Sequence, residues 1–371
     1  MATLNSQARY RKRLSCFISD GRRLTGEWQD GGLVDAAVQE GVDLLLLPET
    51  MDDSLAGFRQ RRKDFAIWHL RISHAMQQIL SAVANTGCQV IVMRGRSLAE
   101  TLYTDPVTRP QSDIDLLMRP NETLAVKQAL WDLGFRPSAA YPNIFQRGDL
   151  MIDTHTEPLG IERIRAWEHL TPLRAEDFFR HSAEGEISGK PALLVQPRVL
   201  LPYLCFHAMK HSFERLIWLV DIALLARKID ADGGWGAVLA GIRDYRLERP
   251  CHYALAYVQA HLGAPVPESL LAAIRPDMGF VERGLFARHM NHAQIPYLAE
   301  RLFARMQPDL KHRLEFWRET IYPRYEVRQQ MASGGCVKCN FIRKRLKQVM
   351  KAAWLFAREG GYLLMHGFAR H

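Results

Sequence analysis

The sequence contains no apolar run that approaches the ~18–20 residues needed to cross a membrane. Its most apolar stretch, "VDLLLLP" at 42–48, is far too short. The basic N-terminal segment is not followed by the long apolar segment of a secretory signal peptide, and no internal repeat or low-complexity linker is present. We therefore expect a globular, cytoplasmic protein, whose 371 residues allow two or three domains at ~100–200 residues each.

Cysteine is scarce and irregularly spaced. Six cysteines in a chain of this length do not form the regular pattern of a disulfide framework. Cys336 and Cys339 make a lone CxxC, and no further ligands stand at the spacing of a structural zinc site. We interpret them as two ordinary thiols, with a reactive thiol pair as the alternative.

Positive charge is in excess, with a formal net charge of +9. Such a balance is typical of proteins that bind a nucleotide, a nucleic acid or an anionic surface, but it also simply aids solubility. The basic C-terminal run at 343–351 has two interpretations, a nucleic-acid contact or a solvated helix face, and the second is favoured. Nucleic acid is therefore an open but not a favoured partner.

The residue pattern changes twice along the chain. Residues 1–88 show apolar positions at three- and four-residue spacing, which predicts helices. Short β-branched and apolar runs separated by glycine and proline then predict strands and turns across 89–196. Helical patterns return over 197–371, beginning with one long patterned run at 200–230. We predict an α/β core at 89–196 between two helical regions.

Two aspartates stand one residue apart in an apolar stretch, "SDIDLLMRP" at 112–120. Residues two apart in a strand point to the same face, so Asp113 and Asp115 project together. Two ionised carboxylates at close range repel each other and lose hydration on burial. Because Mg²⁺ prefers such oxygen ligands, we predict that both aspartates bind metal.

A third carboxylate, Asp153, lies in the strand-like run "LMIDTHTE" at 150–157 and shares its face with His155 and Glu157. If the hairpin predicted at 143–158 places this strand beside the first, Asp153 completes a catalytic and metal-binding triad. A triad of this kind holds one Mg²⁺ ion on a triphosphate and helps to position a second at the attacking oxygen.

A glycine turn precedes both strands. The segment "MRGRSL" follows the predicted strand at 88–95 and precedes a helical pattern. Gly95 lets the backbone approach a phosphate closely, and the N–H groups of the following helix start point at the anion. Arg94, Arg96 and Ser97 add charge and hydrogen bonds, so we predict that all four residues hold the triphosphate.

The order of these motifs resembles the polymerase β-like nucleotidyltransferase superfamily, and more closely its bacterial group of uncharacterised nucleotidyltransferases. That group has a basic-glycine turn, a "DIDLL" strand and a later "hDxH" strand, which match residues 94–98, 113–117 and 152–155. It also has an arginine shortly before the Asp-x-Asp strand, here Arg109. Its helix with paired histidines and a "WLxD"-like segment resembles residues 207–221.

The resemblance implies an α+β fold, in which a small mixed-sheet nucleotidyltransferase core is flanked by N- and C-terminal helical regions. It implies one or two Mg²⁺ ions and a nucleoside triphosphate, with ATP as the abundant default. Arg109 then neutralises charge on the triphosphate or the acceptor, and His155 lies beside the nucleotide.

The histidines of the predicted helix at 200–230 have two interpretations. At ~100° per residue, His207, His211, Trp218 and Asp221 fall on one stripe, with Lys210 at its edge. The stripe either faces the nucleotide, with His207, Lys210 and His211 in contact with it, or forms a buried hydrogen-bond network. A zinc site is disfavoured because Ala208, and not glutamate, follows the first histidine.

These motifs together predict a Mg²⁺-dependent enzyme that moves a nucleoside monophosphate from a triphosphate to an acceptor and releases pyrophosphate. Asp113 and Asp115 bind the metals, and Asp153 also acts as general base on the acceptor hydroxyl. The alternatives are a nucleotide- or anion-binding protein without turnover, and a phosphotransferase on the same fold. The acceptor stays open among small molecules, peptides, proteins and RNA.

Overall fold

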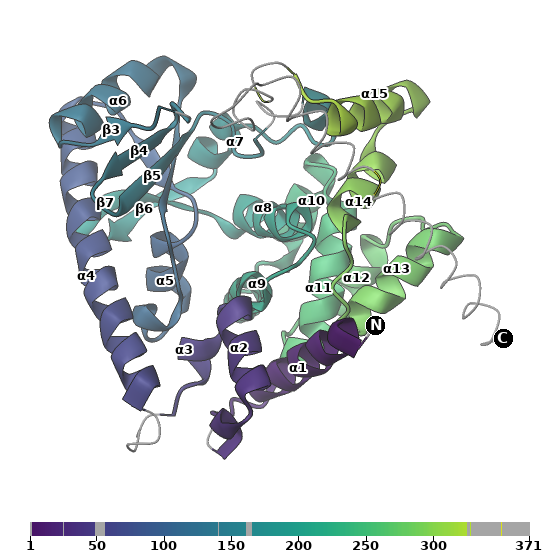
Figure 1. The fold of residues 1–371 in the computed structure, drawn as a ribbon. Helices are drawn as coiled ribbons and strands as arrows, with labels where there is room; N and C mark the ends of the chain where they lie inside the picture. The colour runs from purple at the N-terminus through teal and green to yellow at the C-terminus, as the bar shows by residue number, and fades with distance from the viewer. Residues whose placement is uncertain are drawn as a thin grey trace.

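A computed structural model of the chain describes residues 2–24, 26–48, 56–139, 141–160 and 165–324, together with residues 327 and 350. The CxxC pair and, apart from position 350, the basic run at 343–351 lie outside these residues. Within them, no helix is long and apolar enough to cross a membrane. The fold combines a mixed sheet with helices on either side of it, which confirms the predicted fold class (Figure 1).

The core sheet has five strands in the order β1-β2-β5-β4-β3. The central strands β2 and β5 are parallel, and all other neighbours are antiparallel. The sheet is therefore mixed, as expected. The strand bounds are β1 (Val90–Val92), β2 (Ile114–Met118), β3 (Arg136–Pro137), β4 (Ile144–Arg147) and β5 (Leu150–His155).

Side-chain alternation divides the sheet between two apolar layers. Ile114 and Leu116 on β2, with Ile152 on β5, pack into one core with helices α4 (Ala56–Asn85) and α6 (Thr123–Asp132). Leu117 points the other way, into the larger core that it shares with the C-terminal helices. Because Asp115 has the same parity as Leu117, its carboxylate faces the C-terminal helices and not α4 or α6. Figure 1 shows α4 on the outer side of the sheet and α8 on the other side.

A second, two-stranded sheet lies beside the first. Its strands, β6 (Ser182–Ile187) and β7 (Lys190–Val195), form an antiparallel hairpin. β7 packs against β1 and α4, so the hairpin closes the β1 edge of the core. The short elements around the core are α5 (Arg96–Leu102), η3 (Pro106–Thr108), η4 (Pro120–Glu122), η5 (Arg165–His169) and α7 (Ala175–Arg180).

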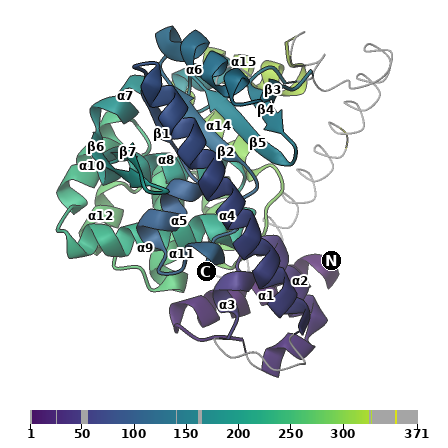
Figure 2. The same cartoon turned by 90° about the vertical axis from the view of Figure 1, so that its left-hand side faces the viewer.

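The N-terminal helices pack against the C-terminal ones. Helix α1 contacts α11 and α2, and Arg11 of α1 donates a 2.7 Å hydrogen bond to the carbonyl of Phe213. Figure 2 shows α1 to α3 beside the lower end of α4. The division of the chain at residues 88 and 196 stays a prediction. The bounds of this group are α1 (Ala2–Ser19), η1 (Gly26–Gln29), α2 (Gly31–Glu40) and α3 (Asp43–Leu46).

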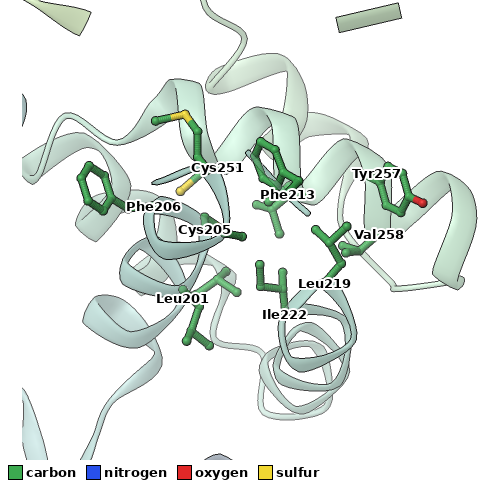
Figure 3. Close-up of a cluster of buried hydrophobic side chains, with 14 of the residues drawn as sticks. Leu201, Cys205, Phe206, Phe213, Leu219, Ile222, Cys251, Tyr257 and Val258 are labelled. Carbon is green, nitrogen blue, oxygen red and sulfur yellow. The ribbon is translucent and has the colours of Figure 1, made fainter. Parts of the chain in front are cut away.

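Helices α8, α9 and α11 share one buried apolar core (Figure 3). Leu201 and Cys205 of α8 meet Ile222 of α9 and Val258 of α11, all at most 1% exposed. This core fixes α8 and α9 relative to each other. The bounds of the group are α8 (Pro197–Lys210), α9 (Leu216–Ala231), α10 (Trp235–Asp244), α11 (Glu248–Leu262), α12 (Glu268–Ala273), α13 (Phe280–Met290), α14 (Leu298–Met306) and α15 (Leu310–Ile321).

The single long helix predicted over 200–230 is wrong. Helix α8 ends at Lys210 and α9 begins at Leu216, with Ser212 at φ 53° and Phe213 at φ 54° between them. Two successive left-handed residues end a helix, at a cost in backbone strain. Burial of the Phe213 ring, which is 1% exposed and stacks on Tyr253, offsets that cost. Periodicity alone carried no sign of this break.

Candidate functional site

The parallel pairing of β2 and β5 brings two of the predicted carboxylates side by side. Asp115 and Asp153 are direct partners in the register of the two strands, and His155 lies two residues further along β5 on the same face. One ligand atom from each of these three residues lies within 4.8 Å of the other two. Nε2 of His155 is 3.3 Å from Oδ1 of Asp115 and 3.4 Å from Oδ2 of Asp153.

Asp113 stands just before β2 and is not one of these three residues. Its side chain is half-buried and accepts a 3.1 Å hydrogen bond from the hydroxyl of Ser112. Burial, with the negative charge of Asp115, raises the pKa of Asp113. Its carboxylate therefore belongs to the same electrostatic cluster, at the edge of the close group.

Arg94 forms a bidentate ion pair with Asp115. Its Nη2 is 2.5 Å from Oδ1 and its Nε is 3.2 Å from Oδ2 of the carboxylate. Burial alone would raise the pKa of Asp115, but the positive charge of Arg94 and the hydrogen bond from His155 outweigh it and hold that pKa below its usual range. Asp115 is therefore ionised at neutral pH.

Asp153 has a different electrostatic environment. Burial raises its pKa, and the negative charges of Asp115 and Asp113 add to the rise, while His155 opposes it. Its side chain is 35% exposed, against 8% for Asp115. Two adjacent carboxylates thus differ in basicity and access: Asp115 is buried and stays ionised, and Asp153 is more accessible and has a higher proton affinity.

The turn between β1 and α5 approaches the segment that leads into β2 at Gly95. This residue has φ 53° and ψ −106°, a conformation that favours glycine. A Cβ atom added there would lie 3.1 Å from Oε1 of Gln111 and 3.6 Å from the carbonyl of Asp113. The turn therefore needs glycine both for its backbone angles and for its close contact with the segment that leads into β2.

Of the predicted phosphate-binding residues, Arg96 has other partners and Ser97 is buried. Arg96 forms an ion pair with Glu100, contacts the ring of His69, and donates a 3.1 Å hydrogen bond to Ser188 of the β6–β7 turn. Ser97 is buried at 9% exposure in the first turn of α5. The structure therefore does not gather Arg96 with the carboxylates, and its role at a triphosphate stays a prediction, as does that of Ser97.

Arg109 is also paired, with Asp221 of α9. Its Nε and Nη2 donate to the two carboxylate oxygens at 2.9 and 2.8 Å, and the hydroxyl of Tyr103 donates to the same carboxylate at 2.7 Å. The side chains of Arg109 and Asp221 are 7% and 2% exposed. The buried network expected as one interpretation of Asp221 is present, and it joins the loop before β2 to α9.

The end of α8 and the start of α9 place aromatic rings beside Arg94. The rings of His207, His211 and Trp218 lie 4.8 to 5.2 Å apart, centroid to centroid, despite the break between the helices. Nη1 of Arg94 is 2.9 Å from Nε2 of His207. Burial, with the charge of Arg94, lowers the pKa of His207 well below its usual value, so this ring is neutral and accepts from the guanidinium. Lys210 points away, toward the carbonyl of Leu159 at 3.2 Å.

Two further polar groups at the site were not predicted. Both amide atoms of Gln111 are buried without a hydrogen-bond partner among the described residues, and so is the hydroxyl of Tyr203 on α8. Tyr203 is 1% exposed, and burial raises its pKa to about 12. The positive charge of Arg94 opposes this rise, and the negative charge of Asp115 adds to it. Buried polar groups without partners are uncommon, and they often mark ligand positions. No sequence motif distinguishes either residue.

The donor set at β2 and β5 fits a divalent cation. Asp115 and Asp153 offer carboxylate oxygens, and His155 offers an imidazole nitrogen. Carboxylates are the ligands that Mg²⁺ and Mn²⁺ prefer, and imidazole is accepted better by transition metals than by Mg²⁺. Asp113 is not part of this close group, and its role as a metal ligand stays a prediction.

Comparison with known proteins gives a family and two solved structures. A family model described as uncharacterised nucleotidyltransferase matches residues 33–263. No curated protein matches the chain. A solution structure of the antibiotic-resistance factor ANT(2″)-Ia is 17% identical with a TM-score of 0.34, over 52% of this chain and 98% of that one. A crystal structure of ANT(2″)-Ia with adenylyl-2″-tobramycin is 17% identical with a TM-score of 0.31, over 46% and 97%.

Proposed function

Since the chain belongs to the family of uncharacterised nucleotidyltransferases, and is thus a transferase that uses a nucleoside triphosphate, we propose that it moves a nucleoside monophosphate to an acceptor hydroxyl and releases pyrophosphate. ATP is the proposed donor. The observation that carries the proposal is the register of β2 and β5, which sets Asp115 beside Asp153, with His155 within 4.8 Å of both.

Asp115, Asp153 and His155 would hold the divalent cation, with Asp113 at its edge, and Mg²⁺ is the proposed ion. When bound, the cation neutralises charge on the phosphates and positions the reacting oxygens for in-line displacement. The contribution of the chain is to keep Asp115 ionised and oriented, through Arg94 and His155, before substrate arrives. Such preorganisation supplies much of the rate enhancement in phosphoryl chemistry.

The β1–α5 turn is the proposed phosphate-binding segment. Gly95 allows close approach of the backbone, and Arg94 is the cationic side chain nearest to the carboxylates. The unpartnered amide of Gln111 stands against this turn and is proposed as an additional hydrogen-bond donor to a phosphate oxygen. Arg96, Ser97 and Arg109 remain proposed contacts of the triphosphate, although Arg96 and Arg109 are paired with Glu100 and Asp221 in the free protein.

Asp153 is the proposed general base. Its 35% exposure leaves it accessible to an acceptor, and burial raises its pKa in the absence of the cation. It would take the proton of the acceptor hydroxyl as that oxygen attacks the α-phosphorus. The rings of His211 and Trp218 are the proposed contacts for the acceptor. They lie at the end of α8 and the start of α9, next to His207, and neither is fully buried.

The test is pyrophosphate release with Mg²⁺ and each nucleoside triphosphate, in the presence of acceptor fractions of small molecules, peptides, proteins and RNA. Asp115→Asn is expected to abolish release, and Asp149→Asn, an exposed carboxylate at the β4–β5 turn, to leave it unchanged. Equal release by the wild type and Asp115→Asn would refute the proposal. A product heavier by phosphate alone would show a phosphotransferase, and tight nucleotide binding without any product would show a binding protein.

A further inference from the structure

Arg94 occupies both oxygens of Asp115. Nη2 and Nε of the guanidinium lie 2.5 and 3.2 Å from Oδ1 and Oδ2, and His155 also contacts Oδ1, at 3.3 Å. The side chains of Arg94 and Asp115 are 18% and 8% exposed, so the pair is shielded from water. An ion pair in such a setting is screened little by salt, and neither partner separates without a replacement.

A divalent cation needs an oxygen of Asp115 at about 2.0–2.1 Å, the usual distance for Mg²⁺. A cation there would stand directly beside the guanidinium, and two positive charges at that separation repel strongly. The same carboxylate therefore has two alternative cationic partners, Arg94 and the metal. Binding of metal alone must include the cost of displacing Arg94.

Among the residues that the structure describes, Asp115 is the only carboxylate that pairs directly with Arg94, while Asp113 acts on it through its charge alone. The other close partner of Arg94 is His207, whose ring is neutral and does not compensate the charge of the guanidinium. Arg94 directly precedes Gly95, the residue at the centre of the proposed phosphate turn. A triphosphate at that turn would supply the anion that Arg94 lacks once it leaves Asp115, since guanidinium binds phosphate as readily as carboxylate.

We infer that Arg94 and the divalent cation are alternative partners of Asp115, and that a nucleoside triphosphate transfers Arg94 from the carboxylate to its phosphates. Metal and nucleotide then promote each other's binding. A nucleotide that binds Arg94 frees Asp115 for the metal, and a metal that binds Asp115 frees Arg94 for the nucleotide. This inference rests on the proposed function, in that it takes the β1–α5 turn as the phosphate site. It makes Arg94 a nucleotide-binding residue that also controls the access of metal to Asp115.

The test measures binding of Mn²⁺ alone, by electron paramagnetic resonance of the free ion, in the wild type and Arg94→Met. The variant is expected to bind Mn²⁺ about tenfold more tightly, within the ~5–150-fold range of typical couplings. The affinity of Arg94→Met for α,β-methylene ATP, measured in EDTA, is expected to be about tenfold weaker than that of the wild type. A merely structural role would weaken both, and that result, or unchanged Mn²⁺ affinity, would overturn the inference.

Arg71→Met is the matched control. Arg71 also forms a bidentate pair with an aspartate, Asp149, but on the outer surface of the sheet region, where both side chains are about half exposed. Its loss is expected to leave both affinities unchanged. A tenfold change in Mn²⁺ affinity in this control would show that overall charge, and not Arg94, sets the metal affinity, and would overturn the inference.

Arg94→Met leaves Asp115 buried without its cation and is at risk of not folding. Arg94→Lys keeps one positive charge but cannot bind both carboxylate oxygens, so its Mn²⁺ affinity is expected between those of the wild type and Arg94→Met. Mn²⁺ affinity in Arg94→Lys at or below that of the wild type would contradict the inference. Mn²⁺ affinity is measured without catalytic turnover. A failure to detect nucleotidyl transfer would therefore refute the proposed function, while the Mn²⁺ affinities of the variants would still test the inference about Arg94.

Discussion

The pair of Arg109 and Asp221 gives a prediction whose magnitude follows from the structure. Asp221 accepts three hydrogen bonds, two from Arg109 and one from Tyr103, at 2.7 to 2.9 Å. Replacement of Arg109 by methionine removes two of the three and leaves a carboxylate that is 2% exposed. Loss of one partner from a buried pair of this kind costs about 3–5 kcal/mol. We expect Arg109→Met to lose that much free energy of unfolding.

Replacement of both partners separates this cost from any effect on the nucleotide. In the double variant Arg109→Met/Asp221→Leu no buried charge is left alone, so its free energy of unfolding is expected to lie within about 1–2 kcal/mol of the wild type. The assay is urea unfolding followed by tryptophan fluorescence, for the single variants and the double variant, with a coupling energy taken from the cycle.

The result that would refute the reasoning is additivity. If the loss of free energy of unfolding in the double variant equalled the sum of the losses in Asp221→Leu and Arg109→Met, Arg109 and Asp221 would not stabilise the protein as a pair. If Arg109→Met were as stable as the wild type but had lost affinity for ATP, the arginine would act on the triphosphate and not on α9.

Two further predictions concern groups at the carboxylates. Burial and the negative charges of Asp115 and Asp113 raise the pKa of Asp153 in the metal-free protein, so a titration of its carboxylate without metal, followed by carbon NMR, should give a pKa above that of an ordinary aspartate. A pKa at or below the ordinary value would contradict this. The buried hydroxyl of Tyr203, which has no partner among the described residues, should destabilise the free protein, so Tyr203→Phe is expected to be neutral or to raise the free energy of unfolding by up to ~1–3 kcal/mol in thermal unfolding. Nucleotidyl transfer by this variant is expected to fall. A destabilised variant would show that the hydroxyl already has a partner.

The central strands were accessible to sequence reasoning because a two-residue period needs only local information. Asp115 lies on the face opposite to Ile114 and Leu116, as the alternation predicts. The expectation that Asp153 would stand beside it is also met, although it required a guess about which strands pair. The close group nevertheless contains His155 in place of Asp113, since Asp113 precedes the strand and is less constrained.

The partners of the arginines could not be predicted. Arg96 is held by His69 of α4 and by Ser188 of the β6–β7 turn, two residues that are distant from it in sequence. A basic residue next to a glycine turn looks the same whether it faces a phosphate or a neighbouring helix. Only the tertiary arrangement shows that Arg94 points toward the carboxylates and Arg96 away from them.

The break between α8 and α9 shows a different limit. The apolar pattern continues across 211–215, and neither glycine nor proline stands there. The left-handed backbone at Ser212 and Phe213 is stabilised by contacts from afar, including the hydrogen bond from Arg11 to the Phe213 carbonyl. Tertiary contacts of this kind override local preference, which is why the predicted helix was too long.

Transfer of radioactive label from ATP to the acceptor fractions tests the proposed function most directly. The proposed function predicts that label at the α-phosphate enters product and that label at the γ-phosphate leaves as pyrophosphate. It also predicts that Asp115→Asn forms no labelled product, while Asp149→Asn behaves as the wild type. Label from the γ-phosphate in the acceptor, or undiminished α-label transfer by Asp115→Asn, would contradict it.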